Sequence, residues 1–184
     1  MGVGRQFVVV TGLPASGKTT VARGLSDSLG LPLLDKDDIL ETLFEAFEVR
    51  TAEDRARLSR ASDAVLETLA RASQGAVLCS FWRAPRRAGQ SGTPVDWIAE
   101  LTADVVVEVA CVCDPTVAAR RFASRERHPS HLDGRHTEDE LRAAFSELAL
   151  DGPIIDLDPL IVDTDGPVDV ERLAALVRDR TSRR

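Results

Sequence analysis

The sequence lacks long apolar runs, has few cysteines and contains almost no lysine. No apolar stretch approaches the ~20 residues that a bilayer-spanning helix needs, so the sequence predicts no membrane segment. The chain enters its first strand-like run within a few residues, which leaves no room for a secretion signal in this sequence. The three cysteines show no C-x-x-C spacing and lie in or beside strand-like runs. We therefore expect reduced, buried thiols and a cytoplasmic protein.

The chain also lacks an excess of positive charge. Its 30 acidic and 23 basic residues give a net charge of −7. Nucleic-acid binding depends on clustered basic charge, so nucleic acid is not the expected partner. Only Lys18 and Lys36 among the basic residues are lysines, and both lie in the segments that carry the chemistry below. A length of 184 residues, with 43% hydrophobic and 29% charged content, is typical of one globular domain spanning 1–184.

The most informative stretch is the motif G-x-x-x-x-G-K-[ST] at Gly12–Thr19. A β-branched apolar run, Phe7–Val10, precedes it, and helical apolar spacing follows over Thr20–Leu29 up to the capping Gly30. An accidental match in a glycine-rich turn would not require that flanking strand and helix, so this context favours a phosphate-binding loop. The candidate nucleotide-binding residues are Gly12, Leu13, Pro14, Ala15, Ser16, Gly17, Lys18, Thr19 and Thr20.

The residue types in this motif suit a nucleotide triphosphate. Gly12 and Gly17 permit backbone conformations and close approaches that a Cβ atom would forbid. The loop amides can then converge on phosphate oxygens at the positive end of a helix. Lys18 is predicted to reach the β- and γ-phosphates and the Thr19 hydroxyl to bind Mg²⁺, so ATP and Mg²⁺ are the expected cofactors.

Strand-like and helical segments alternate along the chain. This order predicts an α/β fold with a parallel sheet of about five strands, helices on both faces and right-handed crossovers. Beyond the first unit, strands are expected at 31–34, 76–80, 105–112 and 160–162, and helices at 39–47, 51–72, 116–126, 137–148 and 168–180. Ligands bind beyond the carboxyl ends of such strands, which gathers the phosphate loop, 35–38, 81–87, 113–114 and 163–164 at one edge.

Acidic residues end the second predicted strand, at Asp35-Lys36-Asp37-Asp38. Phosphoryl transfer to a hydroxyl needs a carboxylate that orients the acceptor and takes its proton. If the segment is extended, Asp35 and Asp37 share one side, so Asp37 is the candidate base and Asp35 the candidate Mg²⁺ ligand or second orienting group. The alternative is that Asp37 or Asp38 is only the N-cap of the next helix.

With these residues in place, G-L-P-A-S-G-K-T followed by L-L-D-K-D-D-I-L-E resembles the small P-loop kinases that phosphorylate metabolites or antibiotics. They include chloramphenicol phosphotransferase, gluconate kinase, zeta toxins and the kinase domain of polynucleotide kinase. The resemblance implies a three-layer fold, and it places their proposed base at Asp37. Many relatives have an Asp near the end of the third strand, where this chain has Cys79-Ser80-Phe81. Because that Asp is missing, the resemblance implies that Mg²⁺ is bound by Thr19, Asp35 and water, or by Ser80.

The same resemblance implies an arginine-rich lid over about 120–137. Arg121 and Arg125, four residues apart, are the candidate catalytic arginines, with Arg121 also a nucleotide contact. A fixed guanidinium can stabilise the transferring phosphoryl group, and the alternative is a solvated arginine face. His128, His131 and His136 fall in this lid, where their spacing lacks a fourth zinc ligand and favours a lid segment over a metal site.

Trp82 and Arg83 follow the third strand and are candidate acceptor-binding residues, together with Asp35 and Asp37. The expected function is transfer of the γ-phosphate of ATP to a hydroxyl of a small molecule such as a sugar, nucleoside or antibiotic. Two alternatives remain open. One is a nucleoside-monophosphate kinase that uses Arg83, Arg86 and Arg87 to hold an acceptor phosphate, and the other is a nucleotide-dependent regulatory or toxin-like protein with a protein partner.

Overall fold

A computed structural model of the chain describes residues 4–87, 89–131, 136–152, 154–155 and 158–183. Its centre is a five-stranded sheet in which every pairing is parallel, with the strand order β2-β3-β1-β4-β5. The strands are β1 (Gln6–Gly12), β2 (Leu33–Asp35), β3 (Gly75–Cys79), β4 (Val105–Val112) and β5 (Leu160–Asp163). The predicted α/β fold is therefore confirmed.

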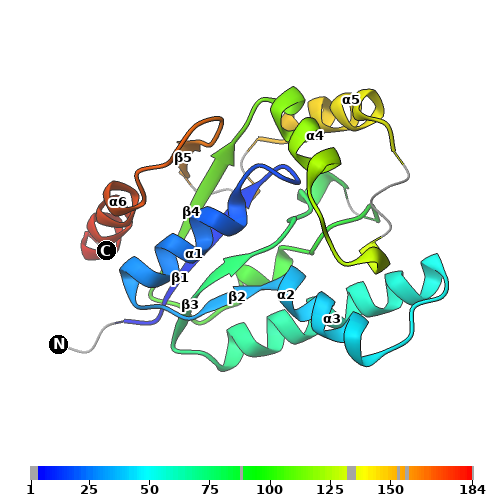
Figure 1. Ribbon diagram of the computed structural model, residues 1–184. Coiled ribbons are helices and arrows are strands. Elements are labelled where there is room, and N and C mark those ends of the chain that lie inside the picture. Colours follow the sequence, from blue (N-terminus) through cyan, green and yellow to red (C-terminus); the bar gives the residue numbers. More distant parts are fainter. Residues whose placement is uncertain (1–3, 88, 132–135, 153, 156–157, 184) are drawn as a thin grey trace.

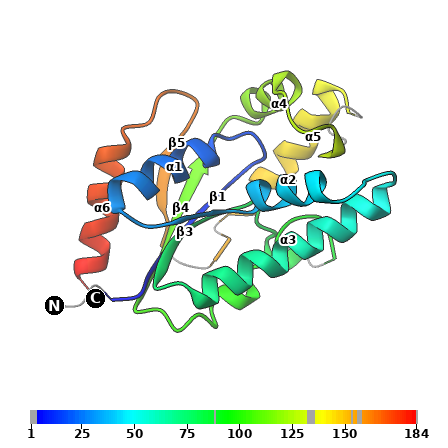
Figure 2. The same ribbon diagram turned by 60° about the horizontal axis from the view of Figure 1, so that its bottom comes forward.

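Helices cover both faces of the sheet (Figures 1 and 2). They are α1 (Lys18–Leu29), α2 (Lys36–Ala46), α3 (Ala52–Ala72), α4 (Pro115–Ser124), α5 (Glu138–Ala149) and α6 (Val170–Ser182). Single 3-10 turns lie at Pro85–Arg87, Asp96–Ile98 and Pro129–His131. No helix in the described part of the chain is long and apolar enough to cross a membrane.

Alternating side chains of the central strand divide the core into two layers. Val8 and Val10 pack with apolar residues of α1 and α6, whereas Phe7 and Val9 pack with α3 and the turn at Asp96–Ile98. This alternation follows from the two-residue period of a strand that is buried on both sides. Two smaller clusters join α4 to α5 and α2 to α3, and these helix pairs flank the carboxyl ends of the strands.

Several helix boundaries agree with their sequence signals. Capping boxes open α3 at Thr51 and α5 at Thr137, and Gly30 ends α1 in the left-handed conformation. Asp114 caps α4, followed by proline in the first turn. Each cap satisfies backbone groups that the helix itself leaves unpaired.

The boundary that matters most for function differs from its prediction. The expectation that 35–37 is extended is wrong, because α2 begins at Lys36, three residues before the predicted start. Asp35 is its N-cap, and its Oδ1 accepts a 2.9 Å hydrogen bond from the backbone N–H of Asp37. The alternative in which Asp37 or Asp38 caps this helix is wrong as well.

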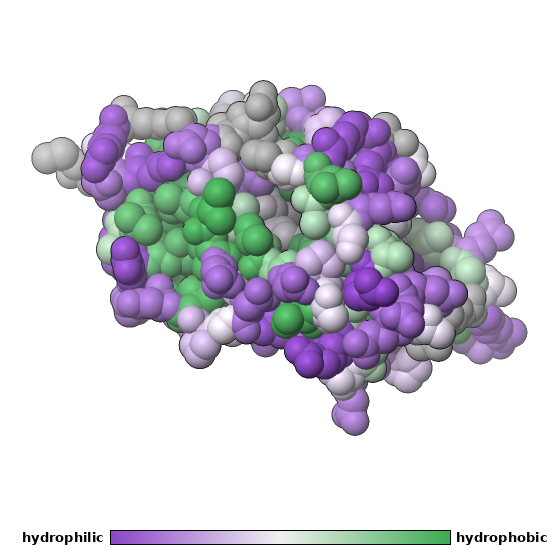
Figure 3. All heavy atoms as spheres, turned by 90° about the horizontal axis from the view of Figure 1, so that it is seen from above, coloured by the Kyte–Doolittle hydropathy of each residue, from purple (hydrophilic) through white to green (hydrophobic). Residues whose placement is uncertain are grey.

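At the opposite side of the sheet, β5 is an edge strand with exposed apolar side chains. Ile161 on β5 is 72% exposed and Val112 on the neighbouring β4 is 53% exposed. Figure 3 shows apolar residues gathered on this side of the molecule, where β5 and α6 lie in Figure 1. The polar cavity described next lies toward the other edge, between the phosphate loop and helices α2 and α3.

Candidate active site

One cavity of about 430 Å³ lies at the carboxyl ends of the strands. The phosphate loop and the end of α4 line one side of it, through residues that include Lys18, Thr19 and Arg121. The start of α2, the first two turns of α3 and the segment after β3 line the other side. Segments far apart in the sequence therefore share one space, as the parallel-sheet rule predicts.

The phosphate loop has the backbone that its glycines allow. Gly12 has a φ of 140°, and a Cβ atom there would lie 2.4 Å from the carbonyl oxygen of Cys111. Gly17 has a φ of 89° and is the N-cap of α1. Ala15 also has a positive φ, of 57°, which is uncommon for a residue other than glycine and typical of strained functional loops.

Two polar side chains of the loop are buried next to this backbone. Lys18 is 9% exposed, and its ammonium group donates a 2.8 Å hydrogen bond to the carbonyl oxygen of Leu13. The Ser16 hydroxyl is fully buried and has no hydrogen-bond partner in the part of the chain that the structure describes. Buried polar atoms of this kind normally have a partner, and phosphate oxygens held by the loop would supply acceptors for both groups.

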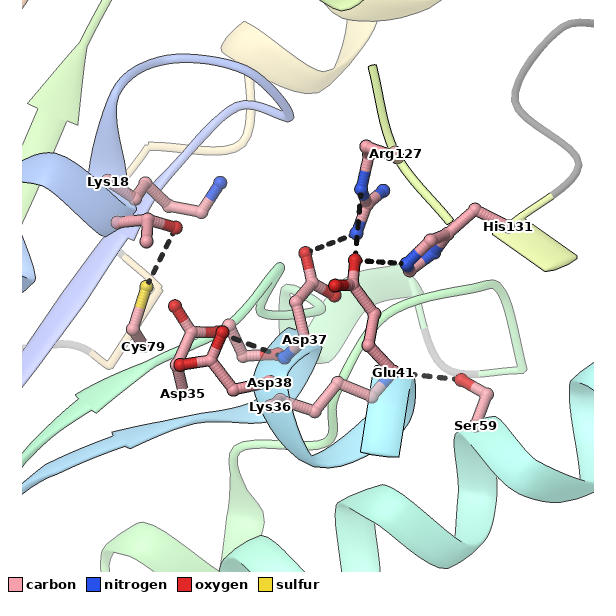
Figure 4. A network of polar contacts seen from close by, with 12 residues as sticks. Lys18, Asp35, Lys36, Asp37, Asp38, Glu41, Ser59, Cys79, Arg127 and His131 are labelled. Atoms are coloured by element: carbon pink, nitrogen blue, oxygen red, sulfur yellow. Dashed lines mark hydrogen bonds and ion pairs between the residues drawn. The ribbon is translucent and has the colours of Figure 1, made fainter. Parts of the chain in front are cut away.

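Below the loop, Cys79 and Asp35 lie together, as Figure 4 shows, and Thr19 contacts Cys79. The Thr19 hydroxyl is 3.9 Å from the Cys79 sulfur, and Asp35 pairs with Cys79 across β2 and β3. Asp35 is 4% exposed, and its Oδ2 is buried without a hydrogen-bond partner among the described residues. Burial raises the pKa of Asp35 above its ordinary value, and the nearby charges of Asp37 and Asp38 add to this effect.

A hydroxyl and an unpaired carboxylate oxygen are ligands that suit Mg²⁺, which also retains water and phosphate ligands. No group of three or more His, Cys, Asp or Glu residues in the described part of the chain could hold a metal ion alone. Thr19 and Asp35 therefore fit a metal that arrives together with the nucleotide phosphates. The buried Cys79 thiol has a pKa well above its ordinary value, because of burial and the Asp35 charge, and stays protonated there.

This arrangement predicts a trade-off at Asp35. Because its folded-state pKa is raised, the ionised carboxylate destabilises the folded state, and stability falls as the pH rises through that pKa. Replacing Asp35 by Asn should raise the melting temperature of the nucleotide-free protein at pH 7, since Asn also caps helices well. The gain should shrink as the pH falls, and Mg²⁺-dependent stabilisation by ATP should weaken. A lower melting temperature at pH 7 without nucleotide would contradict this account.

The candidate base, Asp37, also lines the cavity, from the first turn of α2. Its carboxylate is 49% exposed and accepts a 2.6 Å hydrogen bond from Arg127. Glu41, one turn further along α2, lies 2.8 Å from His131 Nε2 and 3.9 Å from Arg127 Nε. In Figure 4 both carboxylates point toward Arg127.

These contacts dock the segment after α4 onto α2 and α3. His131 is 3% exposed, meets the edge of the Phe44 ring at 5.1 Å between ring centroids, and receives a hydrogen bond from Arg55 Nε at its carbonyl oxygen. His128 lies against the same phenylalanine. Of the predicted lid, 120–124 is the end of α4, 125–131 crosses to α2, and 132–135 lies outside the described residues. His136 is exposed.

The two predicted catalytic arginines both line the cavity on the nucleotide side. Arg121 donates 2.9 Å hydrogen bonds to the carbonyl oxygens of Thr164 and Asp165, so it joins α4 to the turn after β5. Arg125 follows the last residue of α4, and its guanidinium lies 4.1 Å from the centre of the Phe122 ring. The Thr164 side chain also lies beside Gly17, which places this turn next to the phosphate loop.

Trp82 and Arg83 do not line this cavity, contrary to their predicted role in acceptor binding. The Trp82 ring is 3% exposed, packs against Trp97 and donates a hydrogen bond to the Val10 carbonyl oxygen, so it belongs to the core. Arg83 donates to the Gln90 carbonyl oxygen. Phe81, the residue before them, does line the cavity.

Arg86 and Arg87, the other arginines after β3, hold the end of α5. Both are paired with Asp151, whose carboxylate is 6% exposed, and the Arg87 contact is 2.6 Å. Burial alone would raise the pKa of Asp151, but the hydrogen bonds from Arg87 and Arg86 outweigh it and lower that pKa. These two arginines therefore have a structural partner in the described chain.

Sequence reasoning missed a polar network on the acceptor side. Lys36 is 9% exposed, donates to the Ser59 hydroxyl at 2.8 Å and lies 3.6 Å from Asp63. Asp63 accepts from the Thr93 hydroxyl, which is 2.5 Å from that of Ser80. The polar positions within the amphipathic segment 51–72 were the available signal, since Arg55, Ser59 and Asp63 recur every four residues.

A family model described as AAA domain, AAA_33, matches residues 7–148, which include the phosphate loop, Asp37 and the arginines of α4. A search of curated proteins found no match to the sequence.

Solved structures share the fold along nearly the whole chain. A protein from Chloroflexus aurantiacus described as a candidate kinase is 24% identical, with a TM-score of 0.77 and 99% of each chain covered. Shikimate kinase from Bacteroides thetaiotaomicron is 19% identical, with a TM-score of 0.61 and 94% of this chain and 98% of that chain covered. A gluconokinase from Sinorhizobium meliloti is 19% identical, with a TM-score of 0.59 and 99% and 96% covered. The chain belongs to the AAA domain family AAA_33 and has the fold of the small P-loop kinases.

Proposed function

We propose that the protein is an ATP-dependent phosphotransferase that moves the γ-phosphate of ATP to a hydroxyl of a small molecule, with Asp37 as the base. The observation that carries this proposal is that Asp37 and the phosphate-loop residues Lys18 and Thr19 line one cavity. The names of the shikimate kinase and the gluconokinase that share the fold support a small hydroxylated acceptor.

Each step of transfer has a residue of this chain beside it. The loop amides and Lys18 bind and orient the triphosphate. The Asp37 carboxylate accepts the hydrogen bond of the acceptor hydroxyl and then its proton, which requires that the hydroxyl take a place now held by Arg127. Arg121 and Arg125 border the nucleotide side and can stabilise the charge of the transferring phosphoryl group.

Bound Mg²⁺ would neutralise phosphate charge as the phosphoryl group moves. Thr19 and Asp35 are the residues that would hold it, because they offer a hydroxyl and a buried carboxylate oxygen without another partner among the described residues. The three cysteines are free and buried thiols, which fits a reducing compartment such as the cytoplasm.

The contacts of Arg83, Arg86 and Arg87 do not favour the alternative of a nucleoside-monophosphate kinase. It needs arginines free to hold an acceptor phosphate, and Arg86 and Arg87 are engaged with Asp151 whereas Arg83 binds the Gln90 carbonyl. A regulatory protein with a protein partner would use the same phosphate loop without needing an open carboxylate beside it. The 49% exposed Asp37 side chain on the cavity wall favours the kinase.

An acceptor screen tests the proposal. The purified protein with ATP and Mg²⁺ should form ADP rapidly only when a hydroxylated small molecule is present, and mass spectrometry should detect the phosphorylated acceptor. Sugars, sugar acids, nucleosides, aminoglycosides and nucleoside monophosphates form the panel. ADP formation that is unaffected by every acceptor, with inorganic phosphate as the sole product, would contradict a kinase function.

A further inference from the structure

We propose that the acceptor carries a carboxylate in addition to the hydroxyl that is phosphorylated, and that Arg55 binds this carboxylate. The inference rests on the proposed kinase function and specifies its substrate class as hydroxy acids. It comes from the charges on the acceptor side of the cavity, where Lys36 and Arg127 each have an acidic partner and Arg55 has none among the described residues.

Three cations line the acceptor side of the cavity: Lys36, Arg55 and Arg127. Lys36 lies 3.6 Å from Asp63, and Arg127 lies 2.6 Å from Asp37. No ion pair in the described ranges of the chain involves Arg55. An acceptor with a negative group would therefore complete the charge pairing of this side, whereas a positively charged acceptor would meet an uncompensated guanidinium.

The geometry of Arg55 also suits a carboxylate. Its Nε atom donates a 2.9 Å hydrogen bond to the carbonyl oxygen of His131, which fixes the guanidinium plane against the lid segment. Its two terminal nitrogens have no hydrogen-bond partner within the residues that the structure describes. Arginine binds carboxylates through two parallel N–H donors, so a side chain oriented through Nε retains the required fork.

The residues around Arg55 indicate a small and hydroxylated molecule. Ser59, one turn further along α3, lines the same wall, and Ser80 and Ser91 line it from the loop after β3. The cavity volume of about 430 Å³ includes the space beside the phosphate loop, which leaves little room for a large acceptor.

The local charge of the site thus differs from the charge of the whole chain. A net charge of −7 would favour a cationic substrate if long-range attraction alone selected it. Of the acidic groups around the acceptor side, Asp37, Glu41 and Asp63 are already paired with Arg127, His131 and Lys36, and Asp35 is the residue that would hold Mg²⁺. Recognition by contact therefore favours an anion.

Matched acceptors test this inference. Gluconate, glucitol, glucamine and glucitol 1-phosphate share one open-chain skeleton and carry a carboxylate, a hydroxyl, an amine and a phosphate at the same end. Glycerate, glycerol, 3-aminopropane-1,2-diol and glycerol 3-phosphate form a shorter set with the same four end groups. In both sets, kcat/KM for ATP-dependent phosphorylation is measured for the wild type, Arg55→Gln, Arg55→Lys and the control Arg60→Gln, which changes an exposed arginine of the same helix.

The wild type should prefer the carboxylate member of at least one set. Arg55→Gln should lower kcat/KM for that member roughly ten- to hundredfold, the range expected for hydrogen bonds to a charged group, and should leave neutral members and ATP affinity unchanged. Arg55→Lys should retain part of the preference, and Arg60→Gln should retain all of it. An equal loss for every member would show that Arg55 only docks the lid segment, and the inference would be wrong.

The remaining outcomes separate the two proposals. If the neutral, amine or phosphate member is used as well as the acid, the kinase stands and the carboxylate inference falls. A wild-type preference for the acid that survives Arg55→Gln would overturn the assignment of Arg55. If no member of either set is phosphorylated and the acceptor screen finds only acceptors without a carboxylate, the kinase stands and the inference falls. If the screen finds no acceptor at all, the proposed function fails, and the inference falls with it.

Discussion

Replacing Asp37 by Asn is expected to abolish phosphoryl transfer while leaving ATP bound. General-base catalysis contributes about 10²–10⁴ in rate, so kcat should fall by this factor. The Asn side chain keeps the size of Asp37 and can still accept a hydrogen bond from Arg127, so the docked lid segment should persist. The measurement is kcat with a working acceptor, together with ATP affinity by calorimetry.

Asp38→Asn is the matched control for this prediction. Asp38 is the next residue of α2, and its side chain and that of its partner Arg23 are both 60% exposed, with 3.5 Å between Asp38 Oδ1 and Arg23 Nη2. Exposed pairs of this kind stabilise proteins little, so Asp38→Asn should leave both kcat and ATP affinity near the wild-type values. If the two variants lost transfer equally, the role assigned to Asp37 would be wrong.

Replacing Lys18 by Met should have the largest effect on the nucleotide side. Lys18 is 9% exposed and lines the cavity, and its ammonium group donates only to the Leu13 carbonyl oxygen among the described residues. Removing one preorganised donor to a developing charge costs about 10²–10³ in kcat, and loss of a full positive charge beside the phosphates should also weaken ATP binding. Steady-state kinetics and calorimetric titration with ATP measure the two effects.

Arg23→Gln provides the comparison on the same helix. Arg23 is exposed on α1, outside the cavity, and its replacement should change neither kinetics nor ATP affinity. The melting temperature without nucleotide should separate folding from binding, because stabilisation by added ATP should persist in Arg23→Gln and largely disappear in Lys18→Met. Normal ATP-dependent stabilisation of Lys18→Met would count against the assigned role of the phosphate loop.

The sequence allowed the fold and the nucleotide side of the site to be predicted because their signals are local. The strand at 105–112 is the most apolar run of the chain, with Glu108 as its one charged residue, and its observed bounds equal the predicted ones. The capping boxes at Thr51 and Thr137 depend on residues three apart. The phosphate loop is likewise defined by eight consecutive residues.

The start of α2 could not be derived in the same way. Asp35, Asp37 and Asp38 are all good capping residues, so local sequence does not choose among them. The sheet does: Asp35 is the last residue of β2 to pair with β3, opposite Cys79, and the chain turns into the helix directly after it. Asp35 and Asp37 still reach one cavity, although not through the predicted alternation of an extended segment.

The acceptor side depends on contacts between distant segments. Local sequence signals therefore identified its residues less well than those of the phosphate loop. Trp82 lies just after a strand, where acceptor-binding residues are expected. The turn at Asp96–Ile98, however, provides an apolar surface that buries it. Arg127 lies beyond the end of α4, so the four-residue helical spacing indicated Arg121 and Arg125 and gave no signal for Arg127. Its contact with Asp37 arises because the chain crosses to α2, where Phe44 and Glu41 hold the histidines of the lid segment.

The most direct test of the account follows the γ-phosphate itself. With ATP labelled in the γ-phosphate and an acceptor found in the screen, label should appear in the acceptor in equal amount to the ADP formed. Transfer should be lost in Asp37→Asn and retained in Asp38→Asn. Label recovered only as inorganic phosphate, or undiminished transfer by Asp37→Asn, would contradict the claim that this cavity directs an acceptor hydroxyl onto ATP.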